Sequence, residues 1–250
     1  MKKGFPIIEK SKCISNLTAA FKESGPSSLL SQDRAEKFYQ LTDRMLTVNE
    51  QFNLTAITDP DKIILNHYAD CAALALRLPK GAKVIDVGCG AGFPTLPVAI
   101  LRPDVTVLAV DSTAKKVGYV CETANLLGLS NVTALVMRAE DGGNDPKLRG
   151  SFDIATARAV AELRILAELC LPFVKVGGEM IAMKGKNAPQ ELSDARRAVA
   201  MLGGKIEKTE EIFLHGGEED VCHPLIFIKK NSATPAAYPR PYAKISKHPL

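Results

Sequence analysis

Three glycines on alternate positions follow an acidic residue at the end of an apolar run. The run covers residues 84–87, the acid within it is Asp86, and the glycines are Gly88, Gly90 and Gly92. Glycine suits turns in which the backbone takes φ above zero or approaches a ligand closely. A helix that starts after such a turn presents free N–H groups to the bound molecule. The pattern therefore predicts a turn that binds a nucleotide-like cofactor.

The spacing of these glycines distinguishes two kinds of cofactor. A dinucleotide-binding turn reads Gly-x-Gly-x-x-Gly, and its last glycine would fall at the position of Phe93. An acid two residues before the first glycine, as Asp86 is, suits the cationic amino group of S-adenosylmethionine (AdoMet) better than it suits a pyrophosphate. The pattern therefore favours an AdoMet-dependent methyltransferase over a dehydrogenase.

A second acid, Asp111, ends the next apolar run. In a doubly wound sheet the carboxyl ends of neighbouring strands face one crevice, so Asp86 and Asp111 would meet the same ligand, and Asp111 could accept both ribose hydroxyls. The alternative is that the glycines only form a tight turn and that Asp111 only caps the next helix. Because the two features occur together and in order, we favour the cofactor site.

The elements that would position these residues alternate along the chain. Apolar positions at helical spacing predict helices over 29–51 and 59–77, the second starting at Asp59-Pro60. Further strands and helices alternate with short connections, which predicts an α/β fold with a mostly parallel seven-stranded sheet and helices on both faces. The last two strands would form an antiparallel hairpin at one edge. We expect strands over 83–87, 105–110, 132–137, 152–156, 178–183, 206–213 and 223–229, and helices over 93–101, 113–128, 161–171 and 188–202.

Composition is that of a globular protein with at most a small appendage. The chain has 250 residues, of which 46% are hydrophobic and 24% charged. It has no apolar run of about 18 residues, so we expect no membrane span, and the first residues lack a stretch of signal-peptide type, so we expect a cytoplasmic protein. We divide it into a helical amino-terminal extension and cap (1–58), a Rossmann-like domain (59–230) and a tail (231–250).

The tail is basic, contains prolines and has no acidic residue. Such segments are usually solvated, so we expect residues 231–250 to be flexible. The alternative is an arm that follows the phosphates of a nucleic acid.

The six cysteines stand far apart, with no Cys-x-x-Cys pair and no histidines at zinc spacing. We expect free thiols and no metal site. Cys89 lies inside the glycine turn, where a small side chain is required; a catalytic role is the weaker interpretation because no activating base is near it in sequence.

The sequence lacks the elements that two kinds of methylation require, which limits the acceptor atoms that are possible. Methylation of an exocyclic amine calls for an Asn/Asp-Pro-Pro-aromatic element after the fourth strand, and residues 153–160 contain none. Carbon-5 methylation of a pyrimidine calls for a Cys beside Pro, whereas Cys170 and Pro172 stand in the wrong order in a predicted helix. A ring nitrogen such as guanine N7 needs no general base, because positioning and charge stabilisation suffice. Ring-nitrogen, hydroxyl and small-molecule methylation remain open.

Other polar residues fall near the predicted crevice. Arg158 ends the fourth strand, and Lys184 and Lys186 follow the fifth, where they could meet phosphate. His67 and Asp70 are three apart on a predicted helix and so share a face, which suits substrate contact or packing better than metal binding. The alternative for the arginine and the lysines is a solvated surface position.

Together these residues give the chain a resemblance to the small-subunit ribosomal RNA guanine-N7 methyltransferases of the RsmG family, also called glucose-inhibited division protein B. The resemblance covers about residues 40 to 230. It rests on linked motifs: Phe52-Asn53-Leu54-Thr55, His67-Tyr68-Ala69-Asp70, the stretch 86–94, Asp111-Ser112 with Lys115 and Lys116, Arg138-Ala139-Glu140, Arg158-Ala159 and Lys184-Gly185.

This resemblance implies a Rossmann-like class I fold and transfer of the AdoMet methyl group to N7 of one guanine in the decoding-region loop of 16S ribosomal RNA. The partner would be 16S rRNA or the small ribosomal subunit, and we expect a monomer. The implied cofactor residues are Gly88 and Phe93 for methionine and adenosine, Ala139 and Glu140 for adenine, Asp111 for ribose, and Arg158 on the methyl-donor side.

Two positions depart from the family pattern. Thr95 stands where the family usually has Gly, and Cys222 where it has Arg before a late histidine, His223. The first should slightly alter the turn, and the second puts an RNA contact at that edge in doubt. Two other functions share the cofactor residues: methylation of a small molecule, and ribosome assembly with a vestigial cofactor site.

Overall fold

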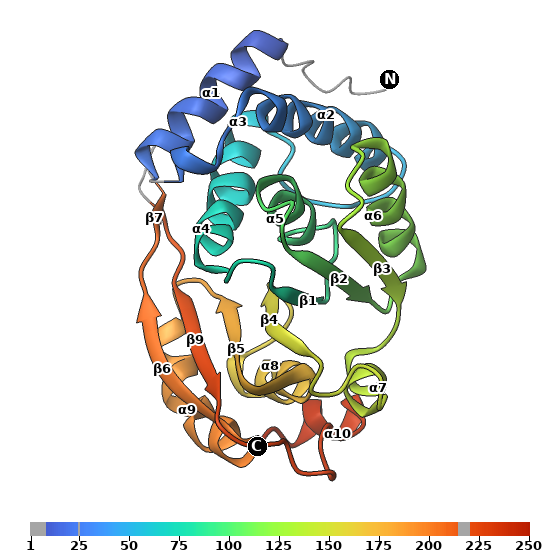
Figure 1. Cartoon of the computed structure of the whole chain (residues 1–250), viewed down its shortest axis with the longest axis vertical. Coiled ribbons are helices and arrows are strands. Elements are labelled where there is room, and N and C mark those ends of the chain that lie inside the picture. Colours follow the sequence, from blue (N-terminus) through green and yellow to red (C-terminus); the bar gives the residue numbers. More distant parts are fainter. Residues whose placement is uncertain (1–8, 25, 215–220) are drawn as a thin grey trace.

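A computed structural model describes residues 9–24, 26–214 and 221–250. Its main feature is a seven-stranded sheet with helices on both faces (Figure 1). This confirms the predicted α/β fold. Across the sheet the strands are β3 (Val132–Val136), β2 (Thr106–Asp111), β1 (Lys83–Val87), β4 (Phe152–Arg158), β5 (Val174–Met183), β9 (Leu225–Lys230) and β6 (Gly204–Glu210).

Strands β1 to β5 run parallel to one another. Strand β9 is antiparallel to both of its neighbours, β5 and β6, which confirms the predicted antiparallel hairpin at one edge. The predicted strand over 206–213 is divided: β6 ends at Glu210, and β7 (Phe213–Leu214) pairs with β8 (Val221–Cys222) in a separate two-stranded ribbon.

The helices form two layers around separate cores. One core lies under α1 (Lys10–Glu23), α2 (Gln32–Asn49), α4 (Asp70–Arg77), α5 (Thr95–Leu101) and α6 (Ala114–Leu126). The other lies under α7 (Ala139–Asn144), α8 (Leu163–Cys170), α9 (Ala188–Met201) and α10 (Tyr242–Lys247). None of the helices in the described ranges is long and apolar enough to cross a membrane.

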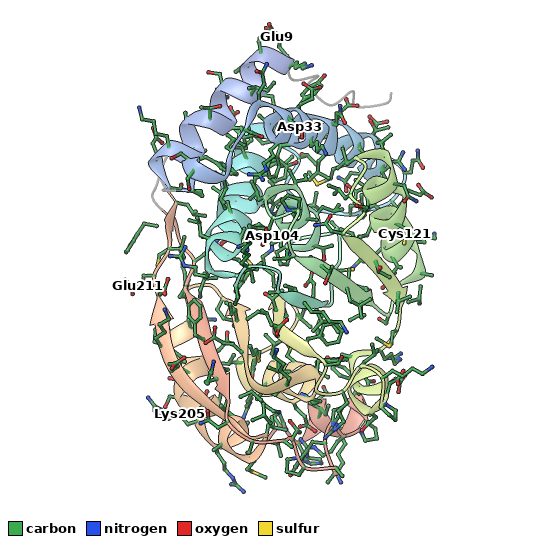
Figure 2. All side chains as sticks on the ribbon, in the orientation of Figure 1. Glu9, Asp33, Asp104, Cys121, Lys205 and Glu211 are labelled. Atoms are coloured by element: carbon green, nitrogen blue, oxygen red, sulfur yellow. The ribbon has the colours of Figure 1, made fainter. Side chains whose placement is uncertain are left out.

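The amino-terminal helices α1 and α2 pack on the helical layer that contains α5, and side chains fill the space between them (Figure 2). Helix α2 buries Phe38, Leu41 and Met45, as its apolar stripe predicts. Helix α1 falls within the predicted helical extension, but its mostly polar residues gave no bounds for it. Its buried Phe21 packs edge-on against Phe38, with 5.8 Å between ring centroids. The first part of the predicted extension, residues 1–8, lies outside the described residues.

The predicted helix over 59–77 is helical throughout but irregular. The Asp59 side chain accepts a hydrogen bond from the Lys62 N–H (2.9 Å) and so caps α3 (Pro60–Ile63). A π-helical turn, Ile64–Ala69, then connects α3 to α4. Such turns insert an extra residue per turn and often lie at functional sites. This one carries His67 and ends next to Asp70.

The segment 231–250 differs from the flexible tail that we predicted. It folds back over the second core, where Ile245 of α10 is fully buried. The buried Lys230 ammonium donates hydrogen bonds to the backbone carbonyls of Leu171 (2.8 Å) and Leu202 (3.0 Å), next to Thr234. The basic composition suggested solvation, but the apolar and hydrogen-bonding partners come from parts of the chain distant in sequence.

Candidate cofactor and methyl-transfer site

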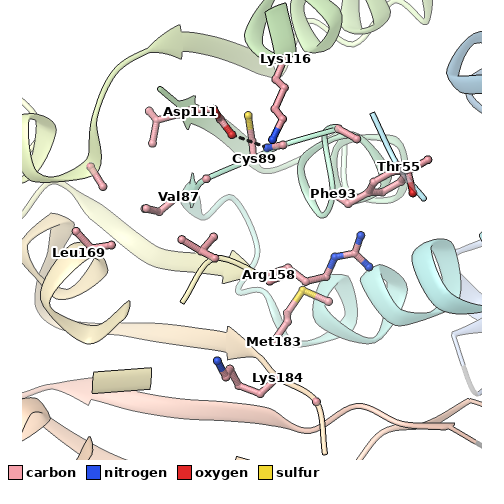
Figure 3. Close-up of a pocket in the computed structure, with 18 of the residues that line it drawn as sticks. Thr55, Val87, Cys89, Phe93, Asp111, Lys116, Arg158, Leu169, Met183 and Lys184 are labelled. Atoms are coloured by element: carbon pink, nitrogen blue, oxygen red, sulfur yellow. Dashed lines mark hydrogen bonds between the residues drawn. The ribbon is translucent and has the colours of Figure 1, made fainter. Parts of the chain in front are cut away.

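A cavity of about 1010 Å³ opens at the carboxyl ends of the parallel strands (Figure 3). This is where ligands bind in open α/β sheets. All the predicted site residues except Asp86 line it: His67, Asp70, Gly88, Gly90, Phe93, Asp111, Ala139, Glu140, Arg158, Lys184 and Lys186. Leu54 and Thr55 line it too, so the fold brings residues from all seven linked motifs of the sequence to one place.

The glycine turn after β1 forms one wall of the cavity. Gly88 and Gly90 have φ of +77° and +54°, values that other residues rarely adopt. The N–H groups of Gly88 and Cys89 donate to the Val110 carbonyl (2.8 and 3.0 Å), which ties the turn to β2. A Cβ atom at position 88 would lie 2.6 Å from a methyl group of Val160. Glycine is therefore required there for both conformation and space.

Asp111 ends β2 on the same wall. One of its carboxylate oxygens accepts from the Gly90 N–H (3.0 Å, Figure 3) and the other from the Thr113 N–H (2.8 Å). An ionised carboxylate has about four acceptor positions, so each oxygen keeps capacity for one more donor. Asp111 therefore fits a vicinal diol such as a ribose, and it also holds the glycine turn in place.

Asp86 lies beneath the turn and not on the cavity wall. Its side chain is fully buried, and one oxygen accepts from the Thr95 hydroxyl (2.6 Å) and the Thr95 N–H (3.3 Å). Burial raises the pKa of this carboxyl to about 6, although the Thr95 bonds oppose the shift. We predicted that Asp86 contacts the cofactor, whereas in the structure it accepts hydrogen bonds from the start of α5. Its partner there, Thr95, is the residue that stands where the family usually has Gly.

Arg158, at the end of β4, joins several residues at the other end of the cavity. Its guanidinium donates to the Asn66 carbonyl (3.0 Å), to the Asp70 carboxylate (3.3 Å) and to Nδ1 of His67 (3.1 Å). It also lies 5.2 Å from the centroid of the Phe93 ring. Arg158 is therefore held in one orientation, and Asp70, itself buried, balances its charge.

His67 is neutral at physiological pH. Burial, and next the Arg158 charge, lower the pKa of its imidazole to about 4. Because Arg158 can only donate, Nδ1 must accept, and the proton is on Nε2, 3.4 Å from the Thr55 hydroxyl. Nδ1 also lies 3.2 Å from the Asn66 carbonyl, but in this tautomer that contact is not a hydrogen bond. The ring stacks on Phe93, with 4.5 Å between centroids.

Comparison with known proteins identifies the family. The family described as rRNA small subunit methyltransferase G (GidB) matches residues 34–220. The chain belongs to this family. The Clostridium perfringens (strain 13 / Type A) protein named Ribosomal RNA small subunit methyltransferase G is 44% identical over 221 residues, which cover 88% of this chain and 92% of the relative. The Lactobacillus johnsonii protein of the same name is 41% identical over 225 residues, covering 88% and 93%.

Solved structures show the same fold at low sequence identity. A transferase from Pyrococcus horikoshii gives a TM-score of 0.52 at 18% identity, covering 65% of this chain and 63% of that chain. TYW2 from M. jannaschii, solved in complex with AdoMet, gives 0.51 at 17% identity, covering 64% and 74%. The fold is therefore that of a class I methyltransferase. Together with the family and the glycine turn, it assigns AdoMet as the cofactor.

Lys184 and Lys186, both predicted to contact the substrate, differ in whether their ammonium groups are free to bind it. The Lys184 ammonium donates to the Ala161 carbonyl (2.8 Å) and pairs with Glu191 (2.6 Å), so it already has two partners. Lys186 is exposed at the rim. Of the two, Lys186 is the exposed residue, and its ammonium is the one available to a phosphate.

Sequence reasoning missed several residues of the wall. Val160 packs against Gly88, Leu169 comes from α8, and Met183 ends β5. The sequence singled out His223 only because it follows Cys222, which differs from the family pattern. In the structure the His223 Nδ1 lies 3.4 Å from an Asp70 carboxylate oxygen. Tyr242 comes from the segment predicted to be flexible. These residues carry no motif, and only their position in the folded chain reveals them.

Proposed function

We propose that the protein transfers the methyl group of AdoMet to N7 of a single guanine in the decoding-region loop of 16S ribosomal RNA. Family membership supports methyl transfer to small-subunit rRNA. N7 is the acceptor that the family resemblance implies. A carbon-5 acceptor is disfavoured because burial raises the pKa of the Cys89 thiol, on the cavity wall, far above the usual range. A protonated thiol does not act as the nucleophile that carbon-5 methylation requires.

The loop after β4 supports the same choice. Residues 158–161 read Arg-Ala-Val-Ala and have no Asn/Asp-Pro-Pro-aromatic element to hold an exocyclic amine. Guanine N7 has a free lone pair and needs neither a thiolate nor an amine clamp. Orientation of the two reactants would then supply most of the rate enhancement.

In this proposal one end of the cavity binds AdoMet and the other end binds the guanine. When bound, AdoMet supplies an electrophilic methyl group on its sulfonium. Asp111 would accept hydrogen bonds from the ribose hydroxyls, and Ala139 and Glu140 would line the adenine. Arg158, Asp70 and His67 would position the guanine at the opposite end, with Lys186 meeting a phosphate at the rim.

The charges at the acceptor end suit this reaction. Methylation at N7 leaves a positive charge on the guanine ring, which an unpaired cation nearby would oppose. The Arg158 charge is balanced by Asp70, and His67 is neutral. The preorganised groups therefore do not repel the charge that develops in the transition state.

The decisive experiment is transfer of labelled methyl from AdoMet to small subunits that lack the modification and, in parallel, to protein-free 16S RNA. We expect a single N7-methylguanine in the decoding-region loop, located by mass spectrometry. An RNA with 7-deazaguanine at that position should accept no label. Label on another atom, or label retained by the 7-deaza substrate, would contradict the proposal.

A small-molecule acceptor is the alternative that shares the cofactor residues. It predicts turnover without RNA and no loss of activity with salt. Contacts between Lys186 and phosphate would instead make RNA binding weaken steeply as the salt concentration rises. Methyl transfer measured from low to high salt distinguishes the two.

The ribose role of Asp111 has its own test. The Asp111→Asn substitution removes the charge and one acceptor, so we expect AdoMet to bind about tenfold more weakly, the loss typical of one hydrogen bond to a charged group. Calorimetry measures this affinity. The control is Asp104→Asn, at the opposite end of β2, where the carboxylate contacts Gly81 and Arg102. Equal affinity for both variants would refute the assignment.

A further inference from the structure

The segment 231–250 is fastened to the methyltransferase fold just before α10. The Arg149 guanidinium donates to the backbone carbonyls of Tyr238 (2.8 Å) and Thr234 (2.8 Å). The Asn144 amide of α7 donates to the Pro239 carbonyl (3.1 Å). These bonds fix the backbone of the segment against α7, so its path is set by side chains of the main domain.

Two stronger anchors bracket Tyr242. The Arg240 guanidinium makes two hydrogen bonds (2.8 and 2.6 Å) to Glu168, whose side chain is 0% exposed. On the other side, Ile245 is fully buried in the second core. Because these anchors lie two residues before and three residues after Tyr242, its position is defined by the fold even though its side chain is 41% exposed.

Tyr242 lines the part of the cavity that lies beside α7 and α8. Helix α10 packs on α8, and Figure 1 shows it beside α7 as well. Both α8 and α7 contribute to the cavity wall at this end, through Leu169 and Ala139. Figure 3 shows Leu169 and Asp111 at one end and Arg158 toward the other. Tyr242 therefore joins the wall beside α7 and α8, the helices that carry Ala139 and Leu169.

We propose that the segment 231–250 completes the cofactor site, and that the ring of Tyr242 packs against the adenine of AdoMet. The inference rests on the proposed cofactor site and adds a residue to it. A half-exposed aromatic ring at the rim of a cavity gains apolar contact when a flat base covers it, and aromatic pairs prefer such offset or edge-on packing. The main domain supplies the ribose acceptor, and the folded-back segment supplies the surface for the base.

An RNA base is the other flat ring that could meet Tyr242. The position of the residue favours the cofactor, since the proposed function puts the methyl acceptor at Arg158, whereas Tyr242 lies beside α7 and α8, and α7 carries the proposed adenine residues Ala139 and Glu140. This separation makes the two occupants distinguishable by binding measurements in the absence of RNA.

The test is calorimetric titration of the full chain with S-adenosylhomocysteine and with 5′-methylthioadenosine. Tyr242→Ala should weaken both ligands by a similar factor, about fivefold for one lost aromatic contact, because both carry the adenosine part. Tyr242→Phe keeps the ring and should bind within about twofold of the unchanged protein. Lys247→Ala, an exposed position on the same helix, should have no effect. Thermal unfolding checks that all variants fold equally well.

A second readout uses the absence of tryptophan from the sequence. Tyr242→Trp introduces a single tryptophan, whose emission should change when S-adenosylhomocysteine binds, whereas Lys247→Trp should give no change. Equal affinity of Tyr242→Ala and the unchanged protein for both ligands would overturn the inference, as would a loss confined to RNA binding. Failure of the unchanged protein to bind either ligand would instead refute the proposed cofactor site.

Discussion

The imidazole of His67, on the cavity wall, makes the stability of the folded protein depend on pH. Its pKa is lowered from 6.5 to about 4, chiefly by burial, so the unfolded chain binds this proton more readily than the folded protein. The contribution of His67 to the free energy of unfolding is therefore fully present above pH 6.5 and is lost as the pH falls toward 4. The loss approaches about 1.4 kcal/mol per pH unit within that window.

We therefore expect the free energy of unfolding to fall less steeply between pH 6.5 and 4 in His67→Gln than in the unchanged protein. The glutamine amide oxygen can still accept from Arg158 but does not titrate. Urea unfolding at several pH values measures the difference. Asp86 acts in the opposite direction between pH 6 and 3.8, which is why the comparison with the variant is needed. Parallel pH profiles would show that His67 does not titrate as described.

The bond between Asp86 and Thr95 joins β1 to the start of α5. The turn between them carries the glycines of the cofactor site, so this buried bond closes the turn from below. The other carboxylate oxygen of Asp86 is buried and has no hydrogen-bond partner among the described residues. The pair is thus a sensitive point of the strand-to-helix connection.

Thr95→Val should lower the free energy of unfolding by about 1 to 3 kcal/mol, the cost of leaving a buried polar group without its partner. The loss should be greater at pH 8 than at pH 5, because the threonine hydroxyl stabilises the ionised carboxylate. Chemical denaturation at both pH values measures it. Thr106→Val, at an exposed position, is the control. The pH dependence of the loss should vanish in the Asp86→Asn background, and its persistence there would contradict this account.

At the scale of the whole molecule, the ion pair between Arg240 and Glu168 holds the segment 231–250 on the main domain. It connects the last part of the chain to α8 across the second core, and the glutamate is fully buried. Removal of one partner from a buried pair leaves an uncompensated charge, which is more costly than loss of both partners.

Arg240→Leu should therefore destabilise the protein by about 3 kcal/mol, whereas the double variant Arg240→Leu with Glu168→Leu should recover much of that loss. Lys10→Ala removes one partner of a partly exposed surface pair with Glu36 and should cost less than about 1 kcal/mol. Denaturant titration gives all three values. Additive losses in the double variant would argue against a coupled buried pair.

The sequence alone determined the cofactor turn and the order of the seven strands of the main sheet along the chain, but not helix α7 or the ribbon of β7 and β8. These features depend on local rules: apolar runs form strands, and glycines permit φ values that other residues avoid. It also grouped the cavity residues correctly, because parallel strands bring their carboxyl ends to one edge. Asp86 is the exception: it does not line the cavity, because its carboxylate is buried and hydrogen-bonded to Thr95.

Tertiary structure decided what depends on partners distant in the chain. The polar helix α1 is held by the packing of Phe21 on Phe38. The basic segment 231–250 is ordered because Glu168, Arg149 and a buried apolar core meet it. No local pattern encodes such partners, and for that reason Tyr242 enters the cavity wall only once the chain has folded.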